Sequence, residues 1–182
     1  VSKDFLISAR GTFTYAKNKI IEQDEPLGVL GTNRSSTGYP IGQIFGLQDE
    51  GLFTDADFVD GELIEGIPEH TFSKVRPGDI KYKDVNKDGV INDLDRSAIG
   101  GTWNPQIVYG FGLNFQYKNF DFGFFFQGNA KTYRLIGGSN FIPGSGDGSM
   151  GNILSNYQDH WTVDNPDQNA FWPRLSSSRN AN

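Results

Sequence analysis

The segment from Asp84 to Asp95 places oxygen-bearing side chains at the spacing of a calcium-binding loop. Such a loop takes side-chain ligands from positions 1, 3, 5, 9 and 12 and a backbone carbonyl from position 7. Counted from Asp84, those positions hold Asp84, Asn86, Asp88, Asn92 and Asp95, with the carbonyl supplied by Val90. Gly89 at position 6 permits the sharp turn. The segment therefore predicts a calcium site with a structural rather than a catalytic role.

Two features separate this segment from a helix-loop-helix EF-hand. Position 12 is Asp95 rather than the longer glutamate, and Pro77 and Gly78 stand where an entering helix would be. Ile91 at position 8 is expected to anchor the loop on apolar neighbours. The alternative interpretation is a solvated turn of Asp, Asn and Gly without a bound ion.

Composition excludes two broad classes of function. The chain of 182 residues has a net charge of -6 and its lysines and arginines are scattered, so it lacks the basic stripe of a nucleic-acid-binding protein. It has no cysteine, its only histidines are His70 and His160, and no pair of carboxylates stands out as catalytic. We therefore expect no nucleic-acid partner and no enzyme activity.

Period-two alternation predicts long β-strands at two places. Phe5 to Lys17 alternates apolar and polar residues. The strongest pattern is a hairpin turning at Lys118 and Asn119. One face carries Ile107, Tyr109, Phe111, Leu113, Phe115, Tyr117, Phe120, Phe122, Phe124 and Phe126, and the other carries Val108, Gly110, Gly112, Asn114, Gln116, Asp121, Gly123, Phe125 and Gln127. Tyr39–Phe53 is interpreted as a further, glycine-interrupted strand, and Ile153–Trp161 as a short amphipathic helix.

The aromatic face favours a membrane barrel over a soluble sandwich. A membrane strand needs only about ten alternating residues, and Tyr109 and Tyr117 are separated by roughly 20 Å of height once strand tilt is included. That spacing suits tyrosines at the two boundaries of an apolar band of about 25 Å, in contact with lipid. The opposite face of Gly, Asn and Gln suits a wet lumen. We predict a transmembrane hairpin at 105–134 between extracellular loops at 54–104 and 135–182, because barrels combine short periplasmic turns with long outer loops.

Four ordered blocks of the sequence resemble SusC/RagA-type TonB-dependent outer-membrane transporters. They are YPIGQIFGLQDEGLF, PGDIKYKDVNKDGVINDLDRSAIG, NPQIVYGFGLNFQYKNFDFGFFFQG and HWTVDNPDQNAFWPRL. The resemblance implies an all-β fold, with antiparallel strands from a large transmembrane β-barrel of about 22 strands. It also implies that the chain is a fragment that cannot close the barrel alone, since it lacks the plug domain and most strands.

The resemblance further implies function and partners. Such proteins sit in the outer membrane of Bacteroidota and import glycan fragments or peptides. They are driven through TonB, whose contacting segment is absent here, and are covered by a SusD-like surface lipoprotein. The family's cation loop matches Asp84, Asn86, Asp88, Val90, Asn92 and Asp95. The alternative function is a soluble, calcium-stabilised cell-surface β-domain that binds carbohydrate. Trp103, Trp161 and Trp172 could stack on sugar rings or simply pack loops together.

Overall fold

The computed structural model describes residues 4–137, 141–142 and 154–176. These residues form eleven strands and three 3-10 turns, with no α-helix among them. None of the helical turns is long and apolar enough to cross a membrane. The elements are β1 (Phe5–Tyr15), β2 (Gln43–Gly46), β3 (Asp49–Leu52), η1 (Asp55–Asp57), β4 (Phe58–Val59), β5 (Glu62–Leu63), β6 (Glu69–His70), β7 (Ile80–Tyr82), β8 (Val90–Ile91), η2 (Asp93–Asp95), β9 (Ser97–Thr102), β10 (Ile107–Tyr117), β11 (Phe120–Ala130) and η3 (Ser155–Gln158).

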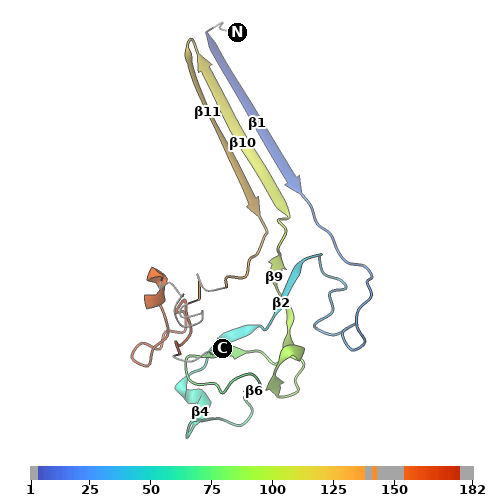
Figure 1. Cartoon of the computed structure of the whole chain (residues 1–182), viewed down its shortest axis with the longest axis vertical. Coiled ribbons are helices and arrows are strands. Elements are labelled where there is room, and N and C mark those ends of the chain that lie inside the picture. The colour runs from blue at the N-terminus through green and yellow to red at the C-terminus, as the bar shows by residue number, and fades with distance from the viewer. Residues whose placement is uncertain (1–3, 138–140, 143–153, 177–182) are drawn as a thin grey trace. The chain divides into compact units, whose positions relative to one another are not determined.

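Three strands of eleven residues each form the main sheet, in the order β1-β10-β11 (Figure 1). Both pairings are antiparallel and without a register shift: Phe5 pairs with Tyr117, Tyr15 with Ile107, and Tyr117 with Phe120. Lys118 adopts a positive φ of 51° in the two-residue turn between β10 and β11. The predicted all-β, antiparallel fold is confirmed, and its few long strands do not close a barrel.

The register gathers the aromatic side chains of all three strands, except Phe125, on one face of this sheet. Phe115 pairs with Phe122 and Phe111 with Phe126, and β1 adds Phe5, Ile7, Phe13 and Tyr15 to the same face. These side chains are open to the surroundings: Phe13 is 70% exposed, Phe120 69% and Phe126 65%. The alternation predicted from sequence is therefore confirmed, and it extends across β1.

The opposite face is polar, with one aromatic side chain lying flat on two glycines. A Cβ at Gly110 or at Gly112 would come within 2.8 Å of the Phe125 ring, so both positions must lack a side chain. The Arg10 guanidinium lies 4.5 Å from the centre of that ring, a favourable cation–π distance. The glycines of β10 thus make room for Phe125.

Two sequence interpretations were wrong. Tyr39–Phe53 does not form one long strand but two strands of four residues, β2 and β3. They are separated at Leu47 and Gln48, where the chain changes partner, because β2 pairs with β9 and β3 pairs with β7. Ile153–Trp161 does not form an amphipathic helix over its described part, where only the 3-10 turn η3 is present. Ile153 itself lies outside the described residues.

The chain divides into two compact units. The first comprises Val1–Glu25, Ser36–Ile44 and Gly100–Arg134 and contains the main sheet; the second comprises Pro26–Ser35, Phe45–Ile99 and Leu135–Asn182. Shorter pairings join β2 with β9, β3 with β7, β4 with β5 and β6 with β8. Strands β4 to β8 are all short and cover only eleven residues of the 54–104 segment.

The second unit is organised around the turn at Pro77–Gly78–Asp79. The Asp79 carboxylate is fully buried, accepts the Arg76 N–H at 2.8 Å and forms an ion pair of 2.9 Å with Arg174. The Gly78 N–H donates to the Phe53 carbonyl, and the Arg174 N–H donates to the Gly78 carbonyl. The Trp161 ring, 3% exposed, rests on the bare Cα of Gly78. Residues 159–174 are therefore clamped to this turn.

We predict that Gly78→Ala releases this clamp. A Cβ at Gly78 would collide with the Trp161 ring, and its φ of 85° is left-handed. We expect the free energy that holds residues 159–174 on the turn to fall by about 2 kcal/mol or more. Tryptic cleavage after Arg174 should then be at least about tenfold faster. The measurement is the rate of that cleavage, followed by mass spectrometry.

Gly66→Ala is the matched control, because Gly66 also has a positive φ, of 92°, but open space around its Cα. It should leave cleavage after Arg174 unchanged. Wild-type cleavage rates in Gly78→Ala would contradict the clamp.

Candidate functional site

The loop from Asp84 to Asp95 is folded by its own side-chain oxygens. Asp84 accepts the N–H of Lys87 at 2.6 Å and of Gly89 at 2.8 Å, and Asp88 accepts the N–H of Val90 at 3.0 Å. Lys87 and Gly89 both have left-handed φ values, of 63° and 87°. The alternating oxygens therefore turn the backbone inward along the whole segment.

Asp95 holds the two ends of the loop together. Its side chain is fully buried, with one oxygen accepting the N–H groups of Val85 and Asn86 and the other accepting the N–H of Asn92. Asn33 donates from its side chain to the carbonyls of Leu94 and Arg96 just beyond. A carboxylate that accepts three backbone N–H groups in a buried position strongly favours the closed loop.

The predicted ligand set fits calcium by its chemistry, because a hard cation prefers oxygen donors from carboxylates, amides and backbone carbonyls. The curled backbone of the loop carries all three kinds of donor. Among residues 4–137, 141–142 and 154–176, however, no group of three or more His, Cys, Asp or Glu side chains is positioned to hold a metal. The carboxylates of Asp84, Asp88 and Asp95 are instead used by backbone N–H groups. Calcium binding stays a prediction.

The loop is anchored on a neighbouring strand. Ile91 is fully buried, as expected for position 8, and β8 pairs in parallel with β6, matching Glu69 to Val90 and His70 to Ile91. The Thr71 N–H and hydroxyl both donate to the Ile91 carbonyl at 3.0 Å. β7 precedes the loop, the 3-10 turn η2 forms its last three residues and β9 follows it, so no EF-hand helix flanks it.

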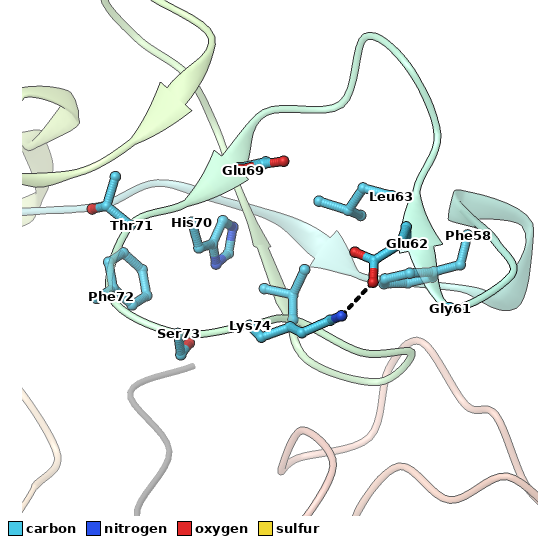
Figure 2. Close-up of a pocket in the computed structure, with 11 residues that line it drawn as sticks. Phe58, Gly61, Glu62, Leu63, Glu69, His70, Thr71, Phe72, Ser73 and Lys74 are labelled. Atoms are coloured by element: carbon cyan, nitrogen blue, oxygen red, sulfur yellow. Dashed lines mark hydrogen bonds and ion pairs between the residues drawn. The ribbon is translucent and has the colours of Figure 1, made fainter.

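A cavity of about 380 Å³ is lined in part by β6. Its walls are the β4–β5 hairpin and the segment from Glu69 to Val75 (Figure 2). The lining residues are Phe58, Gly61, Glu62, Leu63, Glu69, His70, Thr71, Phe72, Ser73, Lys74 and Val75. Sequence reasoning missed this cavity because each wall strand has only two residues and shows no periodicity. The alternation of ring and hydroxyl residues from His70 to Ser73 was the one available signal.

Asp57 fixes the hairpin wall of this cavity. Its carboxylate accepts the Thr54 N–H and hydroxyl, each at 2.8 Å, and pairs with Lys81 at 2.9 Å. Burial acts to raise the pKa of Asp57, but the hydrogen bonds from Thr54 and the charge and hydrogen bond of Lys81 outweigh it and lower the pKa below its ordinary value. The ionised form is therefore the one that the fold stabilises.

The tryptophans differ in access, and Trp172 is half-buried. Trp161 is buried against Gly78 and is closed to ligands in this structure. Trp103 is 37% exposed, with the Arg134 guanidinium 5.6 Å from its ring. The packing role foreseen for Trp161 is therefore the one observed.

Two known proteins are similar to this chain. TonB-dependent receptor P26 of Formosa agariphila is 33% identical over 93 residues, which are 49% of this chain and 9% of the receptor. TonB-dependent receptor P3 of the same organism is 27% identical over 137 residues, which are 72% of this chain and 12% of the receptor. The chain shares partial homology with TonB-dependent receptors. It spans about a tenth of their length, and no protein-family model matches it.

We predict an acid-sensitive cavity wall. A lowered pKa means that Asp57 contributes stability fully above its unfolded pKa of about 4, and that this contribution is lost as pH falls below that value. Asp57→Asn should lower the protection of amides 54–63 at neutral pH by roughly 1–2 kcal/mol and flatten their pH dependence. Hydrogen exchange between pH 6 and pH 3, corrected for intrinsic rates, measures both effects.

Asp55→Asn serves as the control, because Asp55 belongs to the same turn but makes none of the hydrogen bonds to Thr54. It should keep the wild-type pH profile. A profile equally flat in both variants would refute the role of Asp57.

Proposed function

We propose that this chain is part of an outer-membrane TonB-dependent transporter of the SusC/RagA type. Partial homology to TonB-dependent receptors supports the family, and the main sheet supports a place in a barrel wall. The whole protein would import glycan fragments or peptides beneath a SusD-like surface lipoprotein and would take its energy through TonB. Its role would be transport and not catalysis.

The exposed aromatic face of the sheet is the observation that carries this proposal. Strands of eleven residues are about 36 Å long and reach about 25 Å of height at a tilt near 45°, which matches the apolar band of a membrane barrel. Large side chains on this face, such as Phe13, Phe120 and Phe126, would be unfavourable in water as a contiguous patch but favourable in lipid.

The ends of the sheet carry residues suited to the membrane boundary. The Lys131 ammonium lies 5.5 Å from the Tyr15 ring at one end, and the Lys118 ammonium lies 5.4 Å from the Tyr117 ring at the other. Tyrosines and lysines with their polar groups toward water are typical of both interfaces. Two such pairs, one at each end of eleven-residue strands, support a membrane-spanning sheet.

The connections support an orientation. β10 and β11 are joined by two residues, whereas β1 and β10 are joined by residues 16–106. In outer-membrane barrels short turns face the periplasm and long loops face outward. We infer that 54–104 and 135–182 are extracellular, where they would meet substrate and the lipoprotein.

We also propose that the outer loop binds calcium through Asp84, Asn86, Asp88, Val90, Asn92 and Asp95. The ion would neutralise the carboxylates that it binds and would tighten a loop that already curls through its N–H contacts. Its role would be structural, and it would stabilise the segments that the loop holds, including β6.

Adjacent residues on β11 offer a test of the lipid-facing side. Residues 1–182 contain no cysteine, so Phe126→Cys and Gln127→Cys can each carry a single spin label within them. In phospholipid vesicles we expect the label at 126 to collide with oxygen and the label at 127 with a water-soluble nickel complex, measured by power-saturation electron paramagnetic resonance.

The soluble β-domain alternative predicts the opposite behaviour. It requires a protein that is monomeric without detergent, with both labels reached by the nickel complex. That result would eliminate the barrel.

Calcium should protect the 80–96 segment from trypsin. At about 100 times its Kd, the ion is expected to slow cleavage after Lys87 by about 100-fold. Asp84→Ala and Asp88→Ala should abolish this effect, measured as fragment appearance with calcium or with a chelator.

Asp93→Ala is the matched control, because Asp93 lies in the same loop at position 10, which supplies no ligand. This variant should keep the protection. Equal digestion of the unmodified protein with and without calcium would rule the site out.

A further inference from the structure

We propose that the cavity between the β4–β5 hairpin and residues 69–75 binds a neutral saccharide of one or two sugar units. The idea deepens the transport function proposed above, on which it rests for the source of the ligand. The volume of the cavity, about 380 Å³, lies at the small end of the range of roughly 300–1,000 Å³ for ligand pockets.

Rigid aromatic rings supply the apolar part of the cavity. Phe72 is 38% exposed and packs against His70 and Tyr82, with ring centres 5.1 Å and 6.2 Å away. Phe58 packs in the same way against the buried Phe53, at 5.7 Å. Rings held by other rings present a flat surface at little cost in conformational entropy, and the C–H face of a sugar packs well on such a surface.

Charged and hydroxyl groups supply the polar part. Lys74 reaches across the space between the two walls to Glu62, at 2.5 Å, and both side chains are mostly exposed (Figure 2). The Thr71 hydroxyl donates its hydrogen to Ile91, which leaves its oxygen as an acceptor toward the cavity lining. Glu69 adds a further acceptor. The cavity thus offers both donors and acceptors around aromatic rings.

Neutrality of the ligand follows from the Lys74–Glu62 pair. A ligand rich in hydroxyls can bond to both members of the pair without separating them. An anion would compete with Glu62 for Lys74, and a zwitterion would have to break the pair. A purely apolar ligand would desolvate both charges without replacing their hydrogen bonds. A saccharide avoids each of these costs.

Saturation-transfer difference NMR tests the proposal on the full chain in a detergent without a sugar head group, such as dodecylphosphocholine. The probes are glucose, galactose, maltose and cellobiose, with the dipeptide Ala-Ala as a separate arm. We expect saturable binding of at least one saccharide, weakened about fivefold or more by Phe72→Ala and by Lys74→Met.

Two substitutions outside the cavity are matched controls. Phe171→Ala removes another exposed phenylalanine of the same unit, and Lys17→Met removes an exposed lysine from the other unit. Both should leave binding unchanged. Because Lys74 and Glu62 are mostly exposed, Lys74→Met and Glu62→Gln remain informative even if Phe72→Ala fails to fold.

Binding of Ala-Ala alone, binding of no probe, or equal weakening by the control variants would each overturn the proposal. Failure here in a protein whose spin labels report a lipid-facing sheet would remove the saccharide site and leave the transporter in place. Saccharide binding in a protein whose labels both face water would leave the saccharide site in place and remove the transporter.

Discussion

The pairing of β1 with β10 is the constraint on which the first unit depends. These strands are separated in the sequence by residues 16–106, yet their register runs unbroken from Phe5 with Tyr117 to Tyr15 with Ile107. Closing so long an excursion costs chain entropy, although that cost grows only slowly with length. The eleven paired positions repay it, and they also bring both ends of the excursion to the same end of the sheet. The chain therefore leaves β1 and enters β10 at the same end of the sheet.

The second unit is a long connection with little regular structure that is nevertheless ordered. Its order comes from a few buried polar contacts rather than a large apolar core. Asp79 and Arg174 come from blocks 95 residues apart in the sequence, and each needs the other, because a buried carboxylate without its partner would cost several kcal/mol. Trp161 adds apolar cover over Gly78. The PGD and WPR blocks of the sequence are thus two halves of one contact.

Local signals in the sequence were sufficient for the long strands and insufficient for the loops. Alternation over eleven residues fixes the two faces of a strand, so the facing of Phe111, Phe122 and their neighbours could be predicted. Tyr39–Phe53 misled because its apolar residues alternate, although the chain changes pairing partner between Gly46 and Asp49, from β9 to β7. The helix expected to end at Trp161 was wrong because the Trp161 N–H bonds to the Trp172 carbonyl, which draws the chain into an extended bridge. A pairing between residues this far apart in the sequence leaves no local pattern from which it could be predicted.

The strand β6 joins the two candidate sites of the second unit physically. Its partner β8 is part of the 84–95 loop, while His70 on β6 lines the cavity and stacks against Tyr82 at 5.4 Å. Burial, and then the nearby charge of Asp49, raises the pKa of Tyr82, so this stacked ring stays uncharged at neutral pH. An ion that tightens the loop would therefore also hold the rear wall of the cavity. The loop and the cavity are coupled through direct contacts and need no conformational switch. The Thr71 N–H and hydroxyl both donate to the carbonyl of Ile91, which belongs to the loop. Loosening Ile91 loosens the segment that carries Phe72.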